Sequence, residues 1–289
     1  MSDAVRQAAI ALYDRYTHEG LDRRAFMAEL TRIAGSSAAA GALLAGIAAD
    51  PAAAAIVPAD DKRLRTQDIE WPVTGGRKLR GYQARPAAGS VRGAILVIHE
   101  NRGLNDHIRD VARRAALAGY VALAPDFLTS QGGTPADQDA ARNMIGALDL
   151  AATVEDAVAT LDWLRVKTGQ RIGTVGFCWG GGMVNRVAVA AGPKLDAGVV
   201  FYGPAPSPAE AVKVSAPMLI HLAEKDERVN ATALPWIAAL RAAGKQVRVI
   251  NHHGVDHAFH NDTSAERYNA KAATRAWAET LAFFKLHLK

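Results

Sequence analysis

One short stretch decides the fold, and it reads Val175-Gly176-Phe177-Cys178-Trp179-Gly180-Gly181-Gly182. It has a glycine two residues before and two residues after Cys178, which is the pattern of a nucleophile on a sharp strand-to-helix turn. Glycines at these two places let the neighbouring backbone pass without a clash at Cβ. At such a turn Cys178 begins a helix, where the helix dipole favours a thiolate and free N–H groups can bind an oxyanion.

Strands and helices alternate on both sides of this stretch. Continuous apolar runs predict strands covered on both faces at residues 93–99, 120–124 and 172–177. Three more strands are predicted at residues 197–202, 217–223 and 246–251. Helical periodicity predicts helices at residues 106–117, 148–166, 179–191, 234–243 and 266–286. Two earlier strands, 66–73 and 78–85, are joined through Gly75-Gly76, a hairpin signal. The order predicts an α/β fold, with a mostly parallel twisted sheet and helices on both faces.

Candidate partners for Cys178 follow it in the order nucleophile, acid, histidine. Asp226 comes just after the predicted strand 217–223, and His257 comes after the strand that ends near residue 251. Since ligands bind at the carboxyl ends of parallel strands, both side chains are expected to reach the sulfur. His257 would exchange a proton with Cys178, and Asp226 would orient the imidazole. Glu224 and Asp256 are the competing acids.

Neither a metal nor a cofactor is expected. The pair His252-His253 is the sequence's best metal signal, but adjacent residues on a strand point to opposite faces. The run Gly180-Gly181-Gly182 follows a nucleophile turn and does not form a nucleotide-binding loop.

The loop after the predicted strand 93–99 is expected to lie beside Cys178. In this loop Glu100 is a candidate to set the protonation state of the thiol, or a carboxylate that stabilises the loop. An oxyanion would be bound by the backbone N–H groups of Trp179 and Asn101.

Composition excludes several classes of protein. The chain has 289 residues, of which 49% are hydrophobic and 22% charged, so it is globular and long enough to bury a core. A single cysteine excludes an intramolecular disulfide framework and any multi-cysteine metal site. The net charge is +5, but the basic residues are dispersed, which favours a mildly basic enzyme surface over a nucleic-acid-binding one.

Residues 1–58 differ in composition from residues 59–289, which are expected to form the catalytic domain. An amphipathic helix is predicted near residues 4–16. Arg23-Arg24 with Phe26, followed by an Ala- and Gly-rich stretch, indicates either a twin-arginine export signal or a helical extension. An export signal would place the protein in the periplasm, and otherwise we expect it in the cytoplasm. An extension would pack on the catalytic domain or mediate homo-oligomer contacts. No stretch is long and apolar enough for a stable membrane span.

From about residue 67 to its C-terminus, the chain resembles the dienelactone hydrolase family, the cysteine branch of the α/β-hydrolases. The motifs that carry the resemblance are His99-Glu100-Asn101-Arg102-Gly103, Gly119-Tyr120 with Ala124-Pro125-Asp126, Gly176-Phe177-Cys178-Trp179-Gly180-Gly181, and His257-Ala258-Phe259. Leu12-Tyr13-Asp14 and Arg23-Arg24-Ala25-Phe26 resemble a subgroup with a twin-arginine-like leader.

The resemblance implies the α/β-hydrolase fold and a triad of Cys178, His257 and Asp226. It also implies that Glu100 takes the thiol proton when substrate binds. The expected activity is hydrolysis of carboxylic esters or lactones through a thioester, as in a carboxymethylenebutenolidase. The alternatives are a broader esterase or thioesterase with the same triad, and a non-catalytic binding module.

One position departs from the family pattern. In the family an arginine that binds the substrate carboxylate follows the catalytic histidine by one turn, but residues 257–262 contain no arginine. Arg102 and Arg142 are candidate substitutes, and Phe259 is a further candidate for the substrate site. The expected substrate is a small ester or lactone that carries a negative charge if these arginines bind it.

Overall fold

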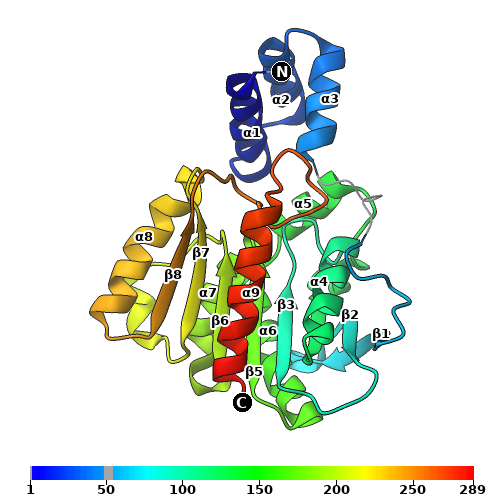
Figure 1. Ribbon diagram of the computed structural model, residues 1–289, viewed down its shortest axis with the longest axis vertical. Helices are drawn as coiled ribbons and strands as arrows, with labels where there is room; N and C mark the ends of the chain where they lie inside the picture. The colour runs from blue at the N-terminus through cyan, green and yellow to red at the C-terminus, as the bar shows by residue number, and fades with distance from the viewer. Residues whose placement is uncertain (1, 49–54) are drawn as a thin grey trace.

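A sheet of eight strands forms the centre of the computed structural model, which describes residues 2–48 and 55–289 (Figure 1). The strands are β1 (Leu64–Pro72), β2 (Lys78–Pro86), β3 (Ala94–Ile98), β4 (Val121–Asp126), β5 (Ile172–Phe177), β6 (Ala197–Phe201), β7 (Met218–Ala223) and β8 (Val247–His252). Their order across the sheet is β1-β2-β4-β3-β5-β6-β7-β8. The predicted α/β fold with a mostly parallel sheet is therefore confirmed.

Strand direction divides the sheet into two parts. β1 and β2 form the expected antiparallel hairpin, and β2 is also antiparallel to β4. All other neighbours are parallel. Gly75 and Gly76 in the hairpin turn both have positive φ, at 68° and 73°, which glycine adopts without a Cβ penalty.

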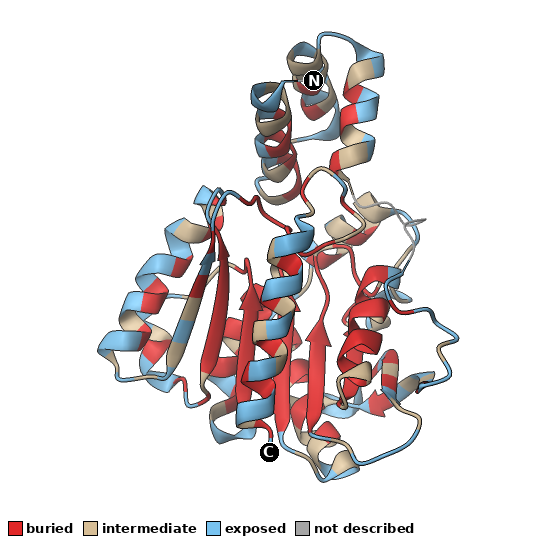
Figure 2. Ribbon diagram, in the orientation of Figure 1, coloured by how far each residue is buried: buried red, intermediate tan, exposed pale blue. Residues whose placement is uncertain are grey.

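Helices cover both faces of the sheet, and alternate strand residues point to each. One face packs against α4 (Asp106–Leu117) and α9 (Ala270–His287). The other packs against α6 (Leu150–Thr168), α7 (Trp179–Ala191) and α8 (Glu227–Ala242). Figure 2 shows the central strands buried along their whole length, as continuous apolar runs predict.

Several helix boundaries differ from the sequence prediction. α8 begins at Glu227 rather than at 234, because the Asp226 carboxylate caps its first turn by accepting from the Val229 N–H. α9 begins at Ala270 rather than at 266, after the Asn269 side chain caps it. A short helix, α5 (Gln138–Gly146), was not predicted.

Residues 2–48 contain three helices, α1 (Asp3–His18), α2 (Arg23–Ala34) and α3 (Ser37–Ile47), which we call the N-terminal unit. The side chains of Ser2, Asp22 and Ser36 cap the first turns of α1, α2 and α3 respectively. Only α1 was predicted by periodicity, as a helix near residues 4–16.

The N-terminal unit sits over one end of the sheet (Figure 1). That end is the carboxyl end of the parallel strands, where Cys178 follows β5. Within residues 2–48 and 55–289, no single helix has the length and apolar composition needed to cross a membrane. α2 and α3 have the required length and composition only when taken together, and the chain bends by 108° at the break between them. Residues 49–54, most of the alanine-rich stretch near the expected boundary at 58, lie outside the described residues.

Candidate active site

Cys178 lies on a strained turn between β5 and α7. Its φ of 55° and ψ of −116° are unusual for a residue with a side chain. A Cβ on Gly176 would come within 2.1 Å of the Gly180 carbonyl oxygen, and a Cβ on Gly180 within 2.4 Å of the carbonyl oxygens of Ile98 and His99. The two glycines are therefore required by close backbone approach, and the turn presents the sulfur above the sheet.

His257 and Asp226 form a buried hydrogen-bonded pair. His257 Nδ1 is 2.5 Å from Asp226 Oδ2, and both side chains are almost fully buried. The competing acid Glu224 is engaged elsewhere, since it accepts from the Gly254 N–H and bonds to His253. Because Asp226 occupies Nδ1, the other ring nitrogen of His257, Nε2, is left for the thiol.

Charge and burial act in opposite directions on the His257–Asp226 pair. Burial alone lowers the pKa of His257, but the charges of Asp226 and Cys178 and the Asp226 hydrogen bond outweigh it, raising the pKa to about 10. Burial raises the pKa of Asp226, and the imidazolium with its hydrogen bond brings that pKa below the ordinary value. At neutral pH the pair is thus an imidazolium and a carboxylate.

The loop after β3 borders the same site. Glu100 is buried, and its Oε2 accepts from Asn261 Nδ2 at 2.6 Å. Its Oε1 is also buried and has no hydrogen-bond partner among the described residues. Trp179 is the first residue of α7, so its N–H lacks an intrahelical partner and is free to bind an anion. Asn101 lies on the loop across from it and lines the site.

The adjacent histidines His252, the last residue of β8, and His253, which follows it, do not point to one shared site. His252 is buried and bonds to His221, whereas His253 is exposed and bonds to Glu224. A different set has spacing compatible with a metal ion among the described residues. One ligand atom each of His18, Cys178 and His257 lie within 4.8 Å of one another.

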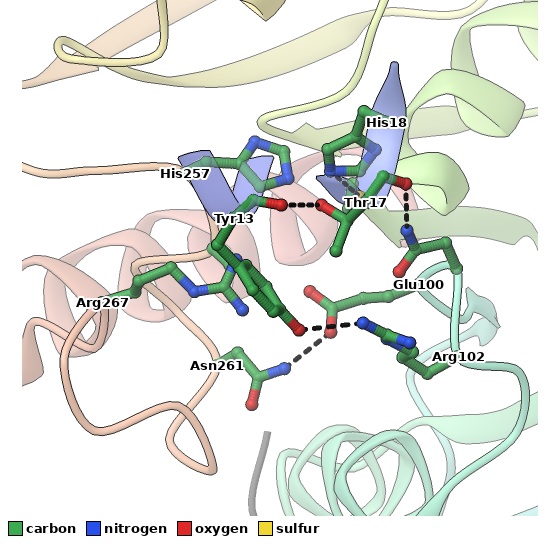
Figure 3. Close-up of a pocket in the computed structure, with 11 residues that line it drawn as sticks. Tyr13, Thr17, His18, Glu100, Arg102, His257, Asn261 and Arg267 are labelled. Carbon is green, nitrogen blue, oxygen red and sulfur yellow. Dashed lines mark hydrogen bonds between the residues drawn. The ribbon is translucent and has the colours of Figure 1, made fainter. Parts of the chain in front are cut away.

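A small cavity at Cys178 is lined by residues from both parts of the chain (Figure 3). Its volume is about 20 Å³. We call residues 55–289 the sheet domain. α1 contributes Tyr13, Thr17 and His18, and the sheet domain contributes Glu100, Asn101, Arg102, Cys178, His257, Ala258, Asn261 and Arg267. The N-terminal unit therefore forms one wall of the candidate active site.

His18 of α1 contacts the sulfur of Cys178. Its Nε2 is 3.9 Å from Cys178 Sγ, and its ring meets the His257 ring edge to face at 5.2 Å. Burial, followed by the positive charge of His257, lowers the pKa of His18 well below its ordinary value. Two imidazoles thus flank the sulfur, His257 charged and His18 neutral.

The three predicted substrate-binding residues lie in different places. Arg102 lines the cavity, but its guanidinium is bonded to the Tyr13 hydroxyl and to Asp139. Arg142 is absent from the cavity lining, and its guanidinium stacks over the ring of Tyr16. Phe259 is fully buried in the core, where its ring packs against Tyr202 and His252.

Sequence reasoning missed three kinds of site residue. Arg267, ten residues after His257, is a second arginine on the cavity, and Asn261 is the partner of Glu100. Thr17 and His18 come from a segment interpreted as an extension or a leader. The contact of His18 with Cys178 spans 160 positions of sequence, and no local pattern reports such a contact.

The sequence model of the dienelactone hydrolase family matches residues 79–288. The relative named "Protein usf", from Aquifex pyrophilus, is 35% identical over 223 residues, covering 74% of this chain and 95% of that protein. The "Putative carboxymethylenebutenolidase" of Aquifex aeolicus is 34% identical over 225 residues, covering 74% of this chain and 96% of that protein.

Among solved structures, the crystal structure titled "Putative Dienelactone Hydrolase" from Klebsiella pneumoniae superimposes with a TM-score of 0.69. It is 28% identical, and the match covers 76% of this chain and 98% of that one. The family match begins at residue 79, so it includes Cys178, Asp226 and His257 and leaves out the N-terminal unit.

Proposed function

The chain belongs to the dienelactone hydrolase family, and from that premise we propose that it hydrolyses carboxylic esters and lactones with Cys178 as nucleophile. The observation that carries the proposal is the position of Cys178, on a strained turn at the N-terminus of α7 and within 4.8 Å of a ring nitrogen of His257. The buried His257–Asp226 pair supports it, because it favours an imidazolium beside the sulfur.

Acylation begins when the Cys178 thiolate attacks the carbonyl carbon. The carbonyl oxygen becomes an oxyanion that accepts hydrogen bonds from the backbone N–H groups of Trp179 and Asn101. When the intermediate collapses, the C–O bond breaks and the leaving oxygen takes the proton from His257. The products are a thioester on Cys178, a neutral His257, and an alcohol or, from a lactone, an enol or hydroxyl on the same molecule.

Deacylation uses the same groups in reverse. Neutral His257 accepts a proton from water through Nε2, and the resulting hydroxide attacks the thioester carbonyl. Collapse releases the carboxylic acid and restores the thiolate beside the imidazolium. In each half-reaction Asp226 holds the tautomer of His257 and stabilises its charge. No cofactor enters these steps.

Glu100 accepts the proton of the Cys178 thiol when substrate binds, before the first attack, and returns it to the sulfur after deacylation has restored the thiolate. Its Oε1 is buried without a partner on the same cavity as the sulfur, so it offers an acceptor there. The bond from Asn261 to the other oxygen fixes the orientation of the carboxylate.

The cavity favours a small substrate with negative charge. Arg102 and Arg267 both line it and both are largely buried. A guanidinium binds a carboxylate with two parallel hydrogen bonds, and burial strengthens this attraction. Arg267 thus takes the place that sequence reasoning offered to Arg142.

A panel of enol-lactones and aryl esters tests the proposed function on wild type and Cys178→Ala. We expect kcat/KM to fall at least about 10³-fold in the variant, because removal of a covalent nucleophile leaves only the oxyanion contacts and binding. Mass spectrometry of wild type quenched during turnover should detect one acyl adduct per chain, on Cys178. Equal turnover in the two proteins would exclude the cysteine mechanism.

A further inference from the structure

The cavity over Cys178 is too small to hold a substrate as the structure stands. Its volume of about 20 Å³ compares with roughly 10–15 Å³ for one water molecule measured in the same way. An ester of any acyl length is larger than that. The wall that closes the cavity is the C-terminal turn of α1, which carries Thr17 and His18 (Figure 3).

The N-terminal unit has an apolar core of its own. Phe26 stacks on Tyr16 with ring centroids 4.3 Å apart and meets Tyr13 edge to face. Leu30 and Leu43 complete the same cluster, which contains only residues of the N-terminal unit among those that the structure describes. The unit can therefore move as a body without exposing the core of the sheet domain.

Polar contacts join the N-terminal unit to the sheet domain. The Arg6 guanidinium donates to the Glu266 carbonyl, and the Glu266 N–H donates to the Gly46 carbonyl. The Ser264 hydroxyl donates to the Ile47 carbonyl at 2.5 Å. Interfaces of this polar kind are typical of parts that move relative to one another.

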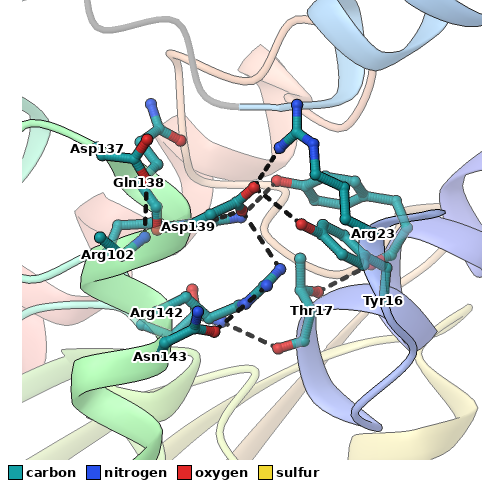
Figure 4. A network of polar contacts seen from close by, with 12 residues as sticks. Tyr16, Thr17, Arg23, Arg102, Asp137, Gln138, Asp139, Arg142 and Asn143 are labelled. Atoms are coloured by element: carbon teal, nitrogen blue, oxygen red, sulfur yellow. Dashed lines mark hydrogen bonds and ion pairs between the residues drawn. The ribbon is translucent and has the colours of Figure 1, made fainter. Parts of the chain in front are cut away.

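Asp139 of α5 connects the two parts (Figure 4). From the N-terminal unit, the Tyr16 hydroxyl donates to its carboxylate at 2.8 Å and Arg23 forms an ion pair with it. From the sheet domain, the same carboxylate binds Arg102 at 3.2 Å and Arg142 at 3.4 Å. Asp139 is therefore the point at which side chains of both parts share one charge.

A second cavity, of about 260 Å³, lies on the Asp139 side of the first. Phe26 and Leu44 contribute to its lining from the N-terminal unit, and Asp137 and Asp139 from the sheet domain. Tyr13 and Arg102 line both cavities. The Arg102 guanidinium donates a hydrogen bond of 2.8 Å to the Tyr13 hydroxyl, and this bonded pair separates the two cavities. Separation of Tyr13 from Arg102 would open the partition toward Cys178.

We propose that the N-terminal unit is the substrate-selecting cap of this active site. It is held shut at Asp139, must lift for an ester to reach Cys178, and supplies His18 and Thr17 as the wall opposite the sulfur. Selection of substrate rests on the proposed hydrolase function, whereas gating of the thiol does not. The cap is a property of residues 2–48, which lie outside the family match.

Alkylation of Cys178 by iodoacetamide measures gating without any substrate. The chain has one cysteine, so the single adduct in an intact mass spectrum reports its accessibility. If the thiol reacts only from the open state, the rate is proportional to the open fraction. Asp139→Asn should raise the rate about tenfold, and Arg23→Ala about two- to fivefold, because Arg23 contributes an exposed ion pair.

Asp162→Asn is the matched control. Asp162 lies on α6, remote from the cap, and its exposed carboxylate is paired with Lys194. It should leave the alkylation rate at the wild-type value. Melting temperatures identify any variant that has lost its fold, and Arg23→Ala, at an exposed position, keeps the test usable if Asp139→Asn does not fold. Unchanged alkylation in Arg23→Ala and Asp139→Asn, or an equal rise in Asp162→Asn, would overturn the gate.

His18→Ala tests the selecting wall. We compare kcat/KM for p-nitrophenyl hexanoate with kcat/KM for p-nitrophenyl acetate. His18→Ala should raise the ratio of hexanoate to acetate about tenfold. His253→Ala, at an exposed histidine, should leave this ratio unchanged. A purely structural role of His18 would lower both rates and keep their ratio, which would overturn its part in selection. If wild type hydrolyses no ester, the proposed function fails and the alkylation result still decides the gate.

Discussion

The sheet domain and the cap position their residues at the Cys178 sulfur through different kinds of interaction. In the sheet domain the backbone positions them, since Cys178, Asp226 and His257 follow the parallel strands β5, β7 and β8. In the cap, side-chain contacts across a polar interface position them, and His18 Nε2 lies 3.9 Å from Cys178 Sγ. The sheet domain is therefore expected to be rigid at the site and the cap adjustable.

This difference assigns separate tasks to the two parts. Covalent chemistry needs fixed distances between reacting groups, which the strained turn and the hydrogen-bonded His257–Asp226 pair provide. Admission of substrate needs a wall that moves at low cost, which a helical unit with its own core provides. Substitutions that act on only one of the two parts can separate these tasks.

The largest difference in stability between the sheet domain and the cap is expected when a glycine of each is replaced by alanine. Gly180→Ala should lower the free energy of unfolding by at least about 4 kcal/mol or prevent folding, because its Cβ would lie 2.4 Å from two backbone oxygens that cannot withdraw. Gly41→Ala, on an exposed position of α3 with nothing within 4 Å, should instead stabilise its helix by about 0.5–1 kcal/mol. Urea unfolding monitored by circular dichroism measures both. A mild Gly180→Ala would contradict the role assigned to close backbone packing at the turn.

A smaller and more local effect is expected in the cap core. Phe26→Ala should destabilise the cap by about 3 kcal/mol, because it leaves a cavity beside Tyr16 and Tyr13. Hydrogen exchange in α1–α3 should accelerate while exchange in the sheet stays slow. Phe284→Ala, which removes a fully buried ring from the main core, should lower the main melting transition instead. A single transition lowered equally by both variants would mean that cap and sheet domain unfold together.

The smallest expected effect concerns the protonation of the two imidazoles at the sulfur, His18 and His257. Burial, then the charges of His257, Arg228, Arg267 and Arg102, lower the pKa of His18, whereas Asp226 and Cys178 raise the pKa of His257 to about 10. Ring-nitrogen NMR should therefore find His18 neutral and His257 protonated at pH 6. His18→Gln assigns the first signal. An ordinary titration of His18 near pH 6.5 would mean that the cap is open in solution.

These shifts have opposite consequences for stability against pH. The raised pKa of His257 contributes stability that is fully present below pH 6.5 and is lost as the pH rises through about 10. The lowered pKa of His18 acts differently, because the lifted or unfolded state binds a proton that the closed state excludes. Closure of the cap should therefore weaken as the pH falls below about 6.5.

Sequence alone predicts most of the sheet domain. Apolar runs as long as a strand, separated by helical periodicity, specify a parallel sheet, and Gly176 and Gly180 on either side of Cys178 specify the turn. Asp226 and His257 could be proposed because strand ends meet at one edge of such a sheet. These are local patterns, and the topology converts them into proximity.

The cap could not be predicted in the same way. Twin arginines, Phe26 and small residues are compatible both with an export signal and with a helical extension. Composition does not report where a helix packs, so it cannot separate the two. In the structure Phe26 is the centre of the cap core and Arg23 binds Asp139. Likewise Arg267 has no distinguishing neighbours in sequence, and its place on the cavity follows from the path of the loop before α9. Tertiary contacts decide these positions.

The closed cavity also bears on the redox chemistry of the sulfur. A thiolate beside an imidazolium is the form that peroxides oxidise to a sulfenic acid. Because the chain has one cysteine, a sulfenic acid at Cys178 has no second thiol in the same chain with which to form a protective disulfide, and further oxidation is irreversible. A cap that leaves room for little more than a water molecule shields the sulfur from oxidants during the intervals between substrates.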